Sequence, residues 1–145
     1  MLSPYQKHQI NFEGCEQGIF CGLSSTPGSV VFIIPSITRI VLDIWADKVI
    51  TTLNEVCCAD QTVRLLCDFS HAENLTTVTP YLSGKFEEIM ANFPTRTGQV
   101  AIVLPNRVLP YRMPRFAADL KRTQQLSIAV SIFSNVEQAF HWLEE

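Results

Sequence analysis

Three polar side chains that could do chemistry follow one apolar run of the sequence. Asp68, Ser70 and His71 stand at the end of the run that begins at Val63. A histidine that acts as general base, oriented by a carboxylate and paired with a nucleophile, is the arrangement of many hydrolases. The nucleophile here would be Ser70 or Cys67, and neither lies in a G-x-S-x-G turn. We therefore predict no catalytic residues and no enzymatic activity, and keep a hydrolase as the third hypothesis.

Metal and cofactor motifs are not found in the sequence. The histidines are far apart and share no H-x-x-x-H or Cys–His spacing, and the cysteines show no C-x-x-C spacing. These residues are His8, His71, His141, Cys15, Cys21, Cys57, Cys58 and Cys67. Neither G-x-x-x-x-G-K-[ST] nor G-x-G-x-x-G occurs. We predict no metal site and no cofactor.

Positive charge is concentrated in one segment. Six of the 11 basic residues lie between positions 96 and 122, where Asp119 is the acidic residue, so the segment carries about +5. Arg107, Arg112 and Arg115 lie in or beside a loop punctuated by prolines. Their guanidinium groups suit a phosphate, a lipid head group or an acidic partner. The alternative is a solvated helix face whose arginines pair with the acidic first helix.

Composition places limits on the class of protein. The chain has 145 residues, of which 47% are hydrophobic and 17% charged, which is enough to bury a core in one domain. Its net charge of −3 argues against nucleic-acid binding. No apolar run approaches the ~20 residues of a membrane span, and the N-terminus has no signal-peptide pattern. An odd number of cysteines indicates reduced thiols. We expect a cytoplasmic protein without a transmembrane segment.

The first third of the chain predicts a hairpin. Apolar runs from Gly18 to Leu23 and from Val30 to Ile34 flank the turn sequence Thr26-Pro27-Gly28-Ser29. A further strand is expected near Gln9 to Glu13, and Met1 to Lys7 is expected to be a loose tail.

Apolar residues spaced three to four positions apart predict two helices. Ser36 is the predicted N-cap of a helix of about 20 residues that ends near Val56. Thr79-Pro80 opens the second, with proline at the first helical position. Gly84 within that helix is unfavourable by propensity, so it predicts close approach to the sheet.

The remaining elements alternate between strand and helix. Strands are expected at Val63 to Phe69, Gln99 to Leu104 and Ser127 to Phe133, with helices from about Met113 to Gln124 and after a capping box at Ser134 to Glu137. Such alternation predicts an α/β fold: a mostly parallel sheet, an N-terminal antiparallel hairpin and about four helices. The whole chain, residues 1–145, is expected to be a single domain, with 1–17 as a loose tail or an extra strand.

Element order and two motifs resemble the STAS family of sulfate-transporter and anti-sigma-antagonist domains. The motifs are Asp68-Phe69-Ser70 after a strand and Ala139-Phe140-x-Trp142-Leu143 in the closing helix. The likeness spans about Gly18 to Leu143 and is greatest to the divergent branch of small bacterial proteins grouped with lipid-binding CRAL-TRIO-like domains. It implies a non-enzymatic regulatory module that docks a protein partner, with homo-oligomerisation left open.

The same resemblance implies where a partner would bind. In anti-sigma antagonists a serine of an Asp-Ser pair is phosphorylated, and that pair falls on or near Thr76-Thr77 here; the hydroxyl is kept and the preceding Asp is not. Helix capping is the other explanation of these threonines. We expect docking through the loop after Asp68, the second helix and the arginine-rich loop. Small anionic ligands also suit those arginines.

A second hypothesis is a carrier of a small apolar ligand or lipid, held between helices and sheet as in CRAL-TRIO-like domains. The high apolar content and the phenylalanines of the second helix, Phe86 and Phe93, agree with it. Filling of the core explains the same residues.

Overall fold

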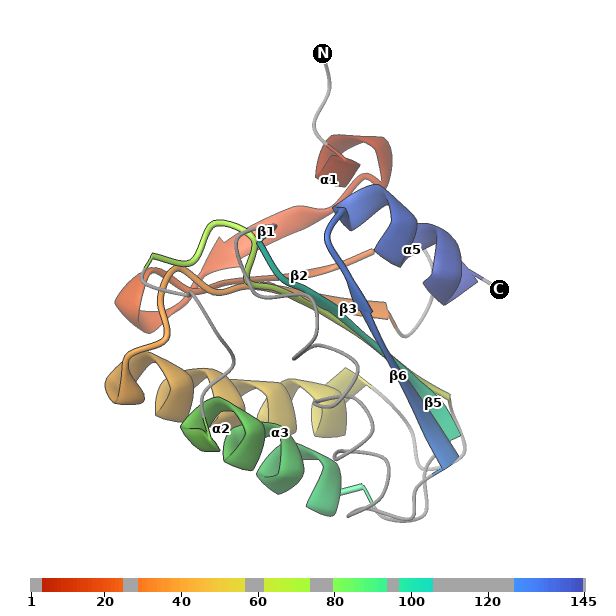
Figure 1. Cartoon of the computed structure of the whole chain (residues 1–145). Helices are drawn as coiled ribbons and strands as arrows, with labels where there is room; N and C mark the ends of the chain where they lie inside the picture. Colours follow the sequence, from red (N-terminus) through yellow and green to blue (C-terminus); the bar gives the residue numbers. More distant parts are fainter. Residues whose placement is uncertain are drawn as a thin grey trace.

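The centre of the molecule is a six-stranded sheet in the order β1-β2-β3-β4-β5-β6 (Figure 1). This computed structural model describes residues 4–24, 29–56, 62–73, 80–93, 97–105 and 127–144. The strands are β1 Asn11–Gly14, β2 Phe20–Leu23, β3 Ser29–Ile33, β4 Val63–Asp68, β5 Thr97–Val103 and β6 Ser127–Phe133. The β1–β2 and β2–β3 pairs are antiparallel and the other three are parallel. The predicted α/β class and the antiparallel N-terminal hairpin are confirmed.

The N-terminal segment differs from a loose tail. Residues Pro4–Lys7 form a helical turn, α1, and a short 3₁₀ helix, η1 Glu16–Gly18, joins β1 to β2. The Tyr5 ring packs edge-on against Phe12 and Phe140, with ring centroids 5.1 and 5.9 Å apart. These contacts hold the turn on the sheet, so the prediction of a loose tail is wrong for this stretch. The extra strand expected near Gln9 to Glu13 is β1.

Helices cover both faces of the sheet. Helices α2 Arg39–Val56 and α3 Pro80–Ala91 lie on one face, and α1 and α5 Val136–Glu144 lie on the other (Figure 1). Consecutive parallel strands joined by right-handed crossovers place their helices on one common face, as α2 and α3 do. The helix predicted from Met113 to Gln124 lies outside the described residues.

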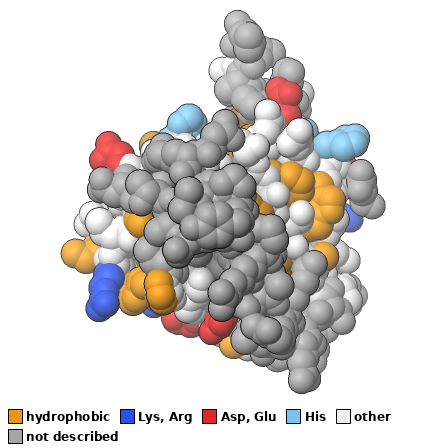
Figure 2. Space-filling view, viewed as in Figure 1, with side chains coloured by type: hydrophobic (Ala, Val, Ile, Leu, Met, Phe, Trp, Pro, Cys, Tyr) orange, Lys and Arg blue, Asp and Glu red, His pale blue; other side chains and the backbone are white. Residues whose placement is uncertain are grey.

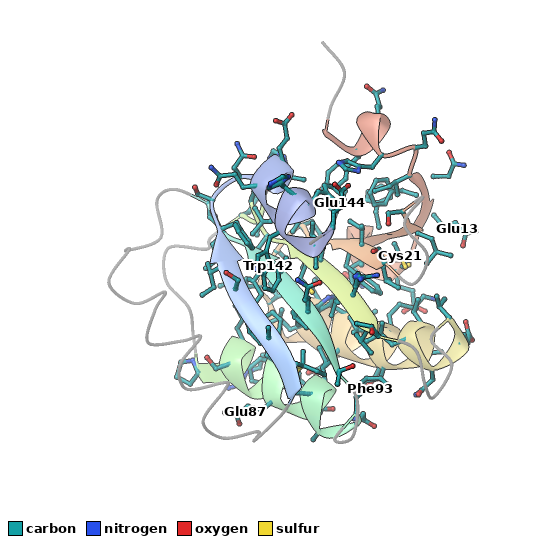
Figure 3. All side chains as sticks on the ribbon, turned by 90° about the vertical axis from the view of Figure 1, so that its right-hand side faces the viewer. Glu13, Cys21, Glu87, Phe93, Trp142 and Glu144 are labelled. Atoms are coloured by element: carbon teal, nitrogen blue, oxygen red, sulfur yellow. The ribbon has the colours of Figure 1, made fainter. Side chains whose placement is uncertain are left out.

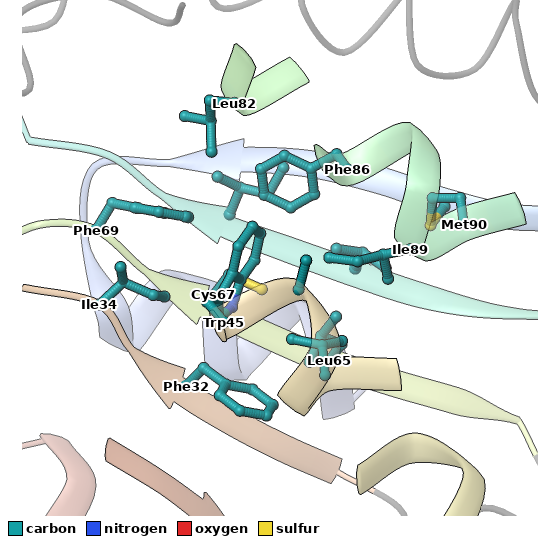
Figure 4. Close-up of a cluster of buried hydrophobic side chains, with 14 of the residues drawn as sticks. Phe32, Ile34, Trp45, Leu65, Cys67, Phe69, Leu82, Phe86, Ile89 and Met90 are labelled. Atoms are coloured by element: carbon teal, nitrogen blue, oxygen red, sulfur yellow. The ribbon is translucent and has the colours of Figure 1, made fainter. Parts of the chain in front are cut away.

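One core fills the space between the sheet and helices α2 and α3. Trp45 of α2 contacts Phe69 and Phe86 edge-on, with ring centroids 5.4 and 5.0 Å apart. All three side chains are buried, and Cys67 of β4 lies beside them (Figure 4). The predicted apolar stripes of both helices are therefore confirmed.

A second core lies between the sheet and α5. Val31, Leu66 and Ala101 of three neighbouring strands meet Phe140 and Leu143 of α5. Since both faces are covered, the central strands are almost continuously apolar, which explains why β3, β4 and β5 show no alternation of polar residues.

The helix caps lie elsewhere than predicted. The Val41 N–H donates to Thr38 Oγ1 at 3.4 Å, so Thr38 and not Ser36 caps α2. Ser36 instead forms an isolated parallel bridge with Glu73, which holds the chain extended beyond β3.

The closing helix α5 is capped by Asn135 and not by Ser134. Asn135 Oδ1 accepts hydrogen bonds from the N–H groups of Glu137 and Gln138 at 2.7 and 3.2 Å. The helix therefore begins one residue later than the capping-box pattern indicates.

Gly84 does not approach the sheet. It is exposed, and a Cβ atom added there would have no neighbour within 4 Å. The close approach occurs at Gly98 of β5, where an added Cβ would lie 2.1 Å from the Val63 carbonyl oxygen. The prediction for Gly84 is wrong, because the glycine lies on the solvent side of its helix.

Candidate functional site

Asp68 is the last residue of β4 and lies at the edge of the sheet where the parallel strands end. Side chains alternate along a strand, so Cys67 points toward α2 and α3 and Asp68 toward α1 and α5. The register pairs Asp68 with Ile33 and Val103 on the neighbouring strands. Asp68 is thus surrounded by sheet on two sides and is 0% exposed.

Both carboxylate oxygens of Asp68 have hydrogen-bond partners within the protein. Oδ1 accepts a hydrogen bond from the Ser70 N–H at 2.8 Å, which closes the turn after β4. Oδ2 accepts one from the Tyr5 hydroxyl. A buried carboxylate needs such donors, because an unpaired charge away from water is costly. The contact fixes the N-terminal turn α1 to the strand end.

The buried position of Tyr5 changes the pKa of its phenol. Burial raises the pKa of its phenol well above the ordinary value of about 10, and the charge of Asp68 and the hydrogen bond to it act in the same direction. The phenol therefore remains a hydrogen-bond donor throughout the ordinary pH range.

Ser70 and His71, the other two polar residues predicted to act beside Asp68, lie nearer to the surface. Ser70 is half-buried and His71 is exposed. Asp68, which would have to orient His71 in a hydrolase, is already bonded by Tyr5 and the Ser70 amide. The three residues are neighbours in one turn, and the hydrogen bonds found there hold the turn together.

Cys67 lies on the opposite face of the sheet from Asp68. It is fully buried in the core beside Trp45 and Phe69 (Figure 4). Burial raises the pKa of its thiol well above the ordinary value, and the Asp68 charge adds to the shift. Only a thiolate is a good nucleophile, so Cys67 is placed as a packing residue.

The other predicted site residues lie outside the described residues. These are Thr76, Thr77, Arg107, Arg112 and Arg115. On the face drawn in Figure 2, the described charged side chains are dispersed, with acidic groups at upper left and along the lower edge and basic groups at lower left. The described part of this face therefore shows charges of both signs in small groups.

A hollow of about 730 Å³ beside α2 was not predicted from the sequence. It is lined by Glu13, Gly14, Cys15 and Glu16 on one side and by Ile44, Asp47, Lys48 and Thr51 of α2 on the other. The polar residues of α2 are visible in the sequence as one helix face. Nothing local indicates that β1 and η1 lie across from them.

A second hollow, of about 390 Å³, adjoins the first and shares Glu13, Cys15 and Lys48 with it. It extends to Cys21 on β2 and to Glu55 near the end of α2. Figure 3 shows Glu13 and Cys21 on neighbouring strands above α2. Burial, followed by the neighbouring Cys15, raises the pKa of the Cys21 thiol to about 11, so this thiol stays protonated at neutral pH.

Comparison with other proteins gives no further assignment. Within the described ranges, no three His, Cys, Asp or Glu residues are grouped as a metal site would require, and no helix is long and apolar enough to cross a membrane. No family model matches the chain, and neither a curated protein nor a solved structure matches it. The resemblance to STAS domains remains a prediction.

Proposed function

We propose that the protein is a non-enzymatic regulatory module that binds a protein partner, in the manner of STAS domains. The partner would contact the loop after Asp68, helix α3 and the arginine-rich segment that includes Arg107, Arg112 and Arg115. These elements follow the carboxyl ends of parallel strands, where α/β sheets commonly bind their ligands and partners. Thr76 and Thr77 would be candidates for phosphorylation in that loop.

The use of Asp68 as a structural residue is the observation that carries this proposal. Its carboxylate is buried and bonded to Tyr5 and to the Ser70 amide. A histidine that acts as general base is held in place by an orienting carboxylate, and Asp68, which would have to orient His71, is bonded to Tyr5 and to the Ser70 amide instead. The turn is therefore better suited to presenting a surface than to catalysis.

Packing of the core weighs against the alternative, a carrier of an apolar ligand. Trp45, Phe69 and Phe86 occupy the space between sheet and helices, where such a ligand would have to lie. The two hollows beside α2 lie outside that core, and the charged side chains of Glu13 and Lys48 line both of them. Native mass spectrometry of freshly purified protein would overturn this preference if it detected a bound lipid.

Partner capture from native lysate tests the docking surface. Simultaneous Arg107→Glu, Arg112→Glu and Arg115→Glu substitutions should abolish recovery of a partner, because charge reversal opposes an acidic surface. Lys48→Glu, an exposed position on the side of α2 that faces β1 and not α3, is the surface-charge control and should leave recovery unchanged. Equal recovery with the triple variant would remove the arginines from the mechanism.

Catalysis is tested separately with the exposed residue of the turn. A panel of ester and phosphoester substrates should show no turnover that depends on His71. If His71→Ala abolished a measurable activity, the module would be an enzyme and the proposal would be wrong. Because the His71 side chain is exposed, this substitution should leave the fold intact.

A further inference from the structure

The two hollows beside α2 form one continuous groove, here called the α2–β1 groove. Its α2 wall runs from Ile44 to Val56, and its other wall is β1, η1 and part of β2. At 1.5 Å per residue this stretch of helix is about 18 Å long. An extended peptide rises ~3.3 Å per residue, so about five or six residues match that length.

The groove is acidic. Glu13, Glu16, Asp47 and Glu55 line it against the single basic residue Lys48, a formal charge of about −3. All four carboxylates are exposed, and within the described part of the chain no salt bridge joins any of them. On the other flank of α2, by contrast, Asp43 is paired with Lys85 at 2.8 Å.

Strand β1 presents an open backbone edge next to this groove. Among the strands that the structure describes, it is the first in the sheet order and pairs with β2 alone. The Cys15 N–H donates to the Ile19 oxygen at 2.7 Å, toward β2. Because the direction of these groups alternates along an antiparallel strand, the N–H and C=O groups of Phe12 and Gly14 point away from β2. An open edge of this kind can pair with a further strand.

The opposite face of the same edge is apolar. Side chains alternate along β1 and β2, so Phe12 and Phe20 lie on the face away from Glu13 and Cys21. Phe20 is 44% exposed and Phe12 is half-buried. A strand added beside β1 would therefore meet carboxylates on one face and aromatic rings on the other.

We propose that the β1 edge binds an extended peptide in which basic and apolar residues alternate. Its main chain would pair with Phe12 and Gly14, its basic side chains would reach Glu13 and Asp47, and its apolar side chains would cover Phe20. Strand addition of this kind takes affinity from main-chain hydrogen bonds and specificity from alternate side chains. The surface belongs to elements other than the loop proposed above, so it does not depend on that assignment.

Synthetic peptides test the pattern. The probe is a terminally blocked hexapeptide of alternating lysine and valine, measured by calorimetric titration of the full chain. One control has the same composition in blocks, three lysines and then three valines, and a second replaces lysine by glutamate. We expect the alternating lysine peptide to bind at least tenfold more tightly than either control, and to weaken as salt rises. Equal binding of the block peptide, or no binding of the alternating one, would overturn the proposal.

Protein variants locate the site. Glu13→Lys together with Asp47→Lys should weaken binding of the alternating peptide at least tenfold. Glu88→Lys, an exposed position on α3 with the same charge change per residue, should leave it unchanged. Circular dichroism checks the fold of each variant. If the double variant bound as tightly as the native chain, the assignment of a peptide to this edge would be wrong.

Discussion

The Tyr5 hydroxyl donates a hydrogen bond to the buried carboxylate of Asp68, a residue 63 positions further along the chain. The contact joins the N-terminal turn α1 to the carboxyl end of β4. It also gives the carboxylate a second donor besides the Ser70 amide. A residue that resembles a catalytic acid in the sequence is therefore an anchor for the N-terminus in the structure.

Tyr5→Phe should destabilise the protein. The substitution keeps the ring that packs on Phe12 and Phe140 and removes the donor to Asp68. A buried acceptor that loses its partner costs about 1–3 kcal/mol, and more when it is charged. Urea denaturation followed by tryptophan fluorescence should report a loss of that size in the free energy of unfolding.

A second tyrosine provides the matched control. The Tyr81 hydroxyl donates to Asp43 on the surface, between α3 and α2. Solvent can replace that bond, so Tyr81→Phe should cost clearly less than Tyr5→Phe. Equal losses for the two variants would mean that burial of Asp68 adds nothing to the strength of its contact.

Raising the pH into the alkaline range should lower the free energy of unfolding of the native chain more than that of the Tyr5→Phe variant. Burial and the Asp68 charge raise the pKa of Tyr5 in the folded state above that in the unfolded chain. The folded protein thus holds a proton that the unfolded chain releases, so this contribution is complete below pH ~10 and declines as the pH rises above it. Stability curves measured from pH 8 to 11.5 should converge at the alkaline end. If the stability curves of the native chain and the variant stayed parallel, the pKa of Tyr5 would not be raised on folding.

Local sequence patterns were sufficient for most of the elements. The apolar stripe of α2 and the strand-length, mostly apolar segment of β6 depend on residues a few positions apart, so local patterns indicated them. Cap positions were missed because neighbouring polar residues satisfy the same pattern. Ser36 and Thr38 both precede α2, and the tertiary structure decides between them: Thr38 accepts the hydrogen bond from the Val41 N–H, and Ser36 bridges to Glu73.

Long-range contacts could not be read from the sequence. Asp68 was correctly placed at a strand end, yet its partner Tyr5 belongs to a segment without a helical or strand pattern of its own. The α2–β1 groove depends in the same way on where β1 comes to lie relative to α2. The arginine-rich segment and Thr76-Thr77 lie outside the described residues, so the predictions for them stand untested.

Gly84→Ala should stabilise the protein by about 0.5–1 kcal/mol. Gly84 is exposed within α3, and an added Cβ meets no atom within 4 Å. Alanine restricts the unfolded chain and favours the helix without any steric cost. Thermal and urea unfolding both measure the change.

Gly98→Ala is the opposite test in strand β5. The added Cβ would lie 2.1 Å from the Val63 carbonyl oxygen, and backbone atoms cannot move aside as a flexible side chain would. We expect a loss of about 1–3 kcal/mol or more. If Gly98→Ala were neutral while Gly84→Ala destabilised, the two glycines would have been assigned the wrong roles.

Asn135→Ala should cost about 1 kcal/mol of stability, because the Asn135 side chain accepts hydrogen bonds from the first N–H groups of α5. Ser134→Ala should cost less than half as much, since Ser134 precedes the cap and is exposed. Denaturant unfolding of the two variants side by side distinguishes the positions. A larger loss for Ser134→Ala would restore the capping box that the sequence pattern indicates. Because α5 covers Leu66 and Ala101 of the sheet, hydrogen exchange in β4 and β5 should also rise in the Asn135→Ala variant.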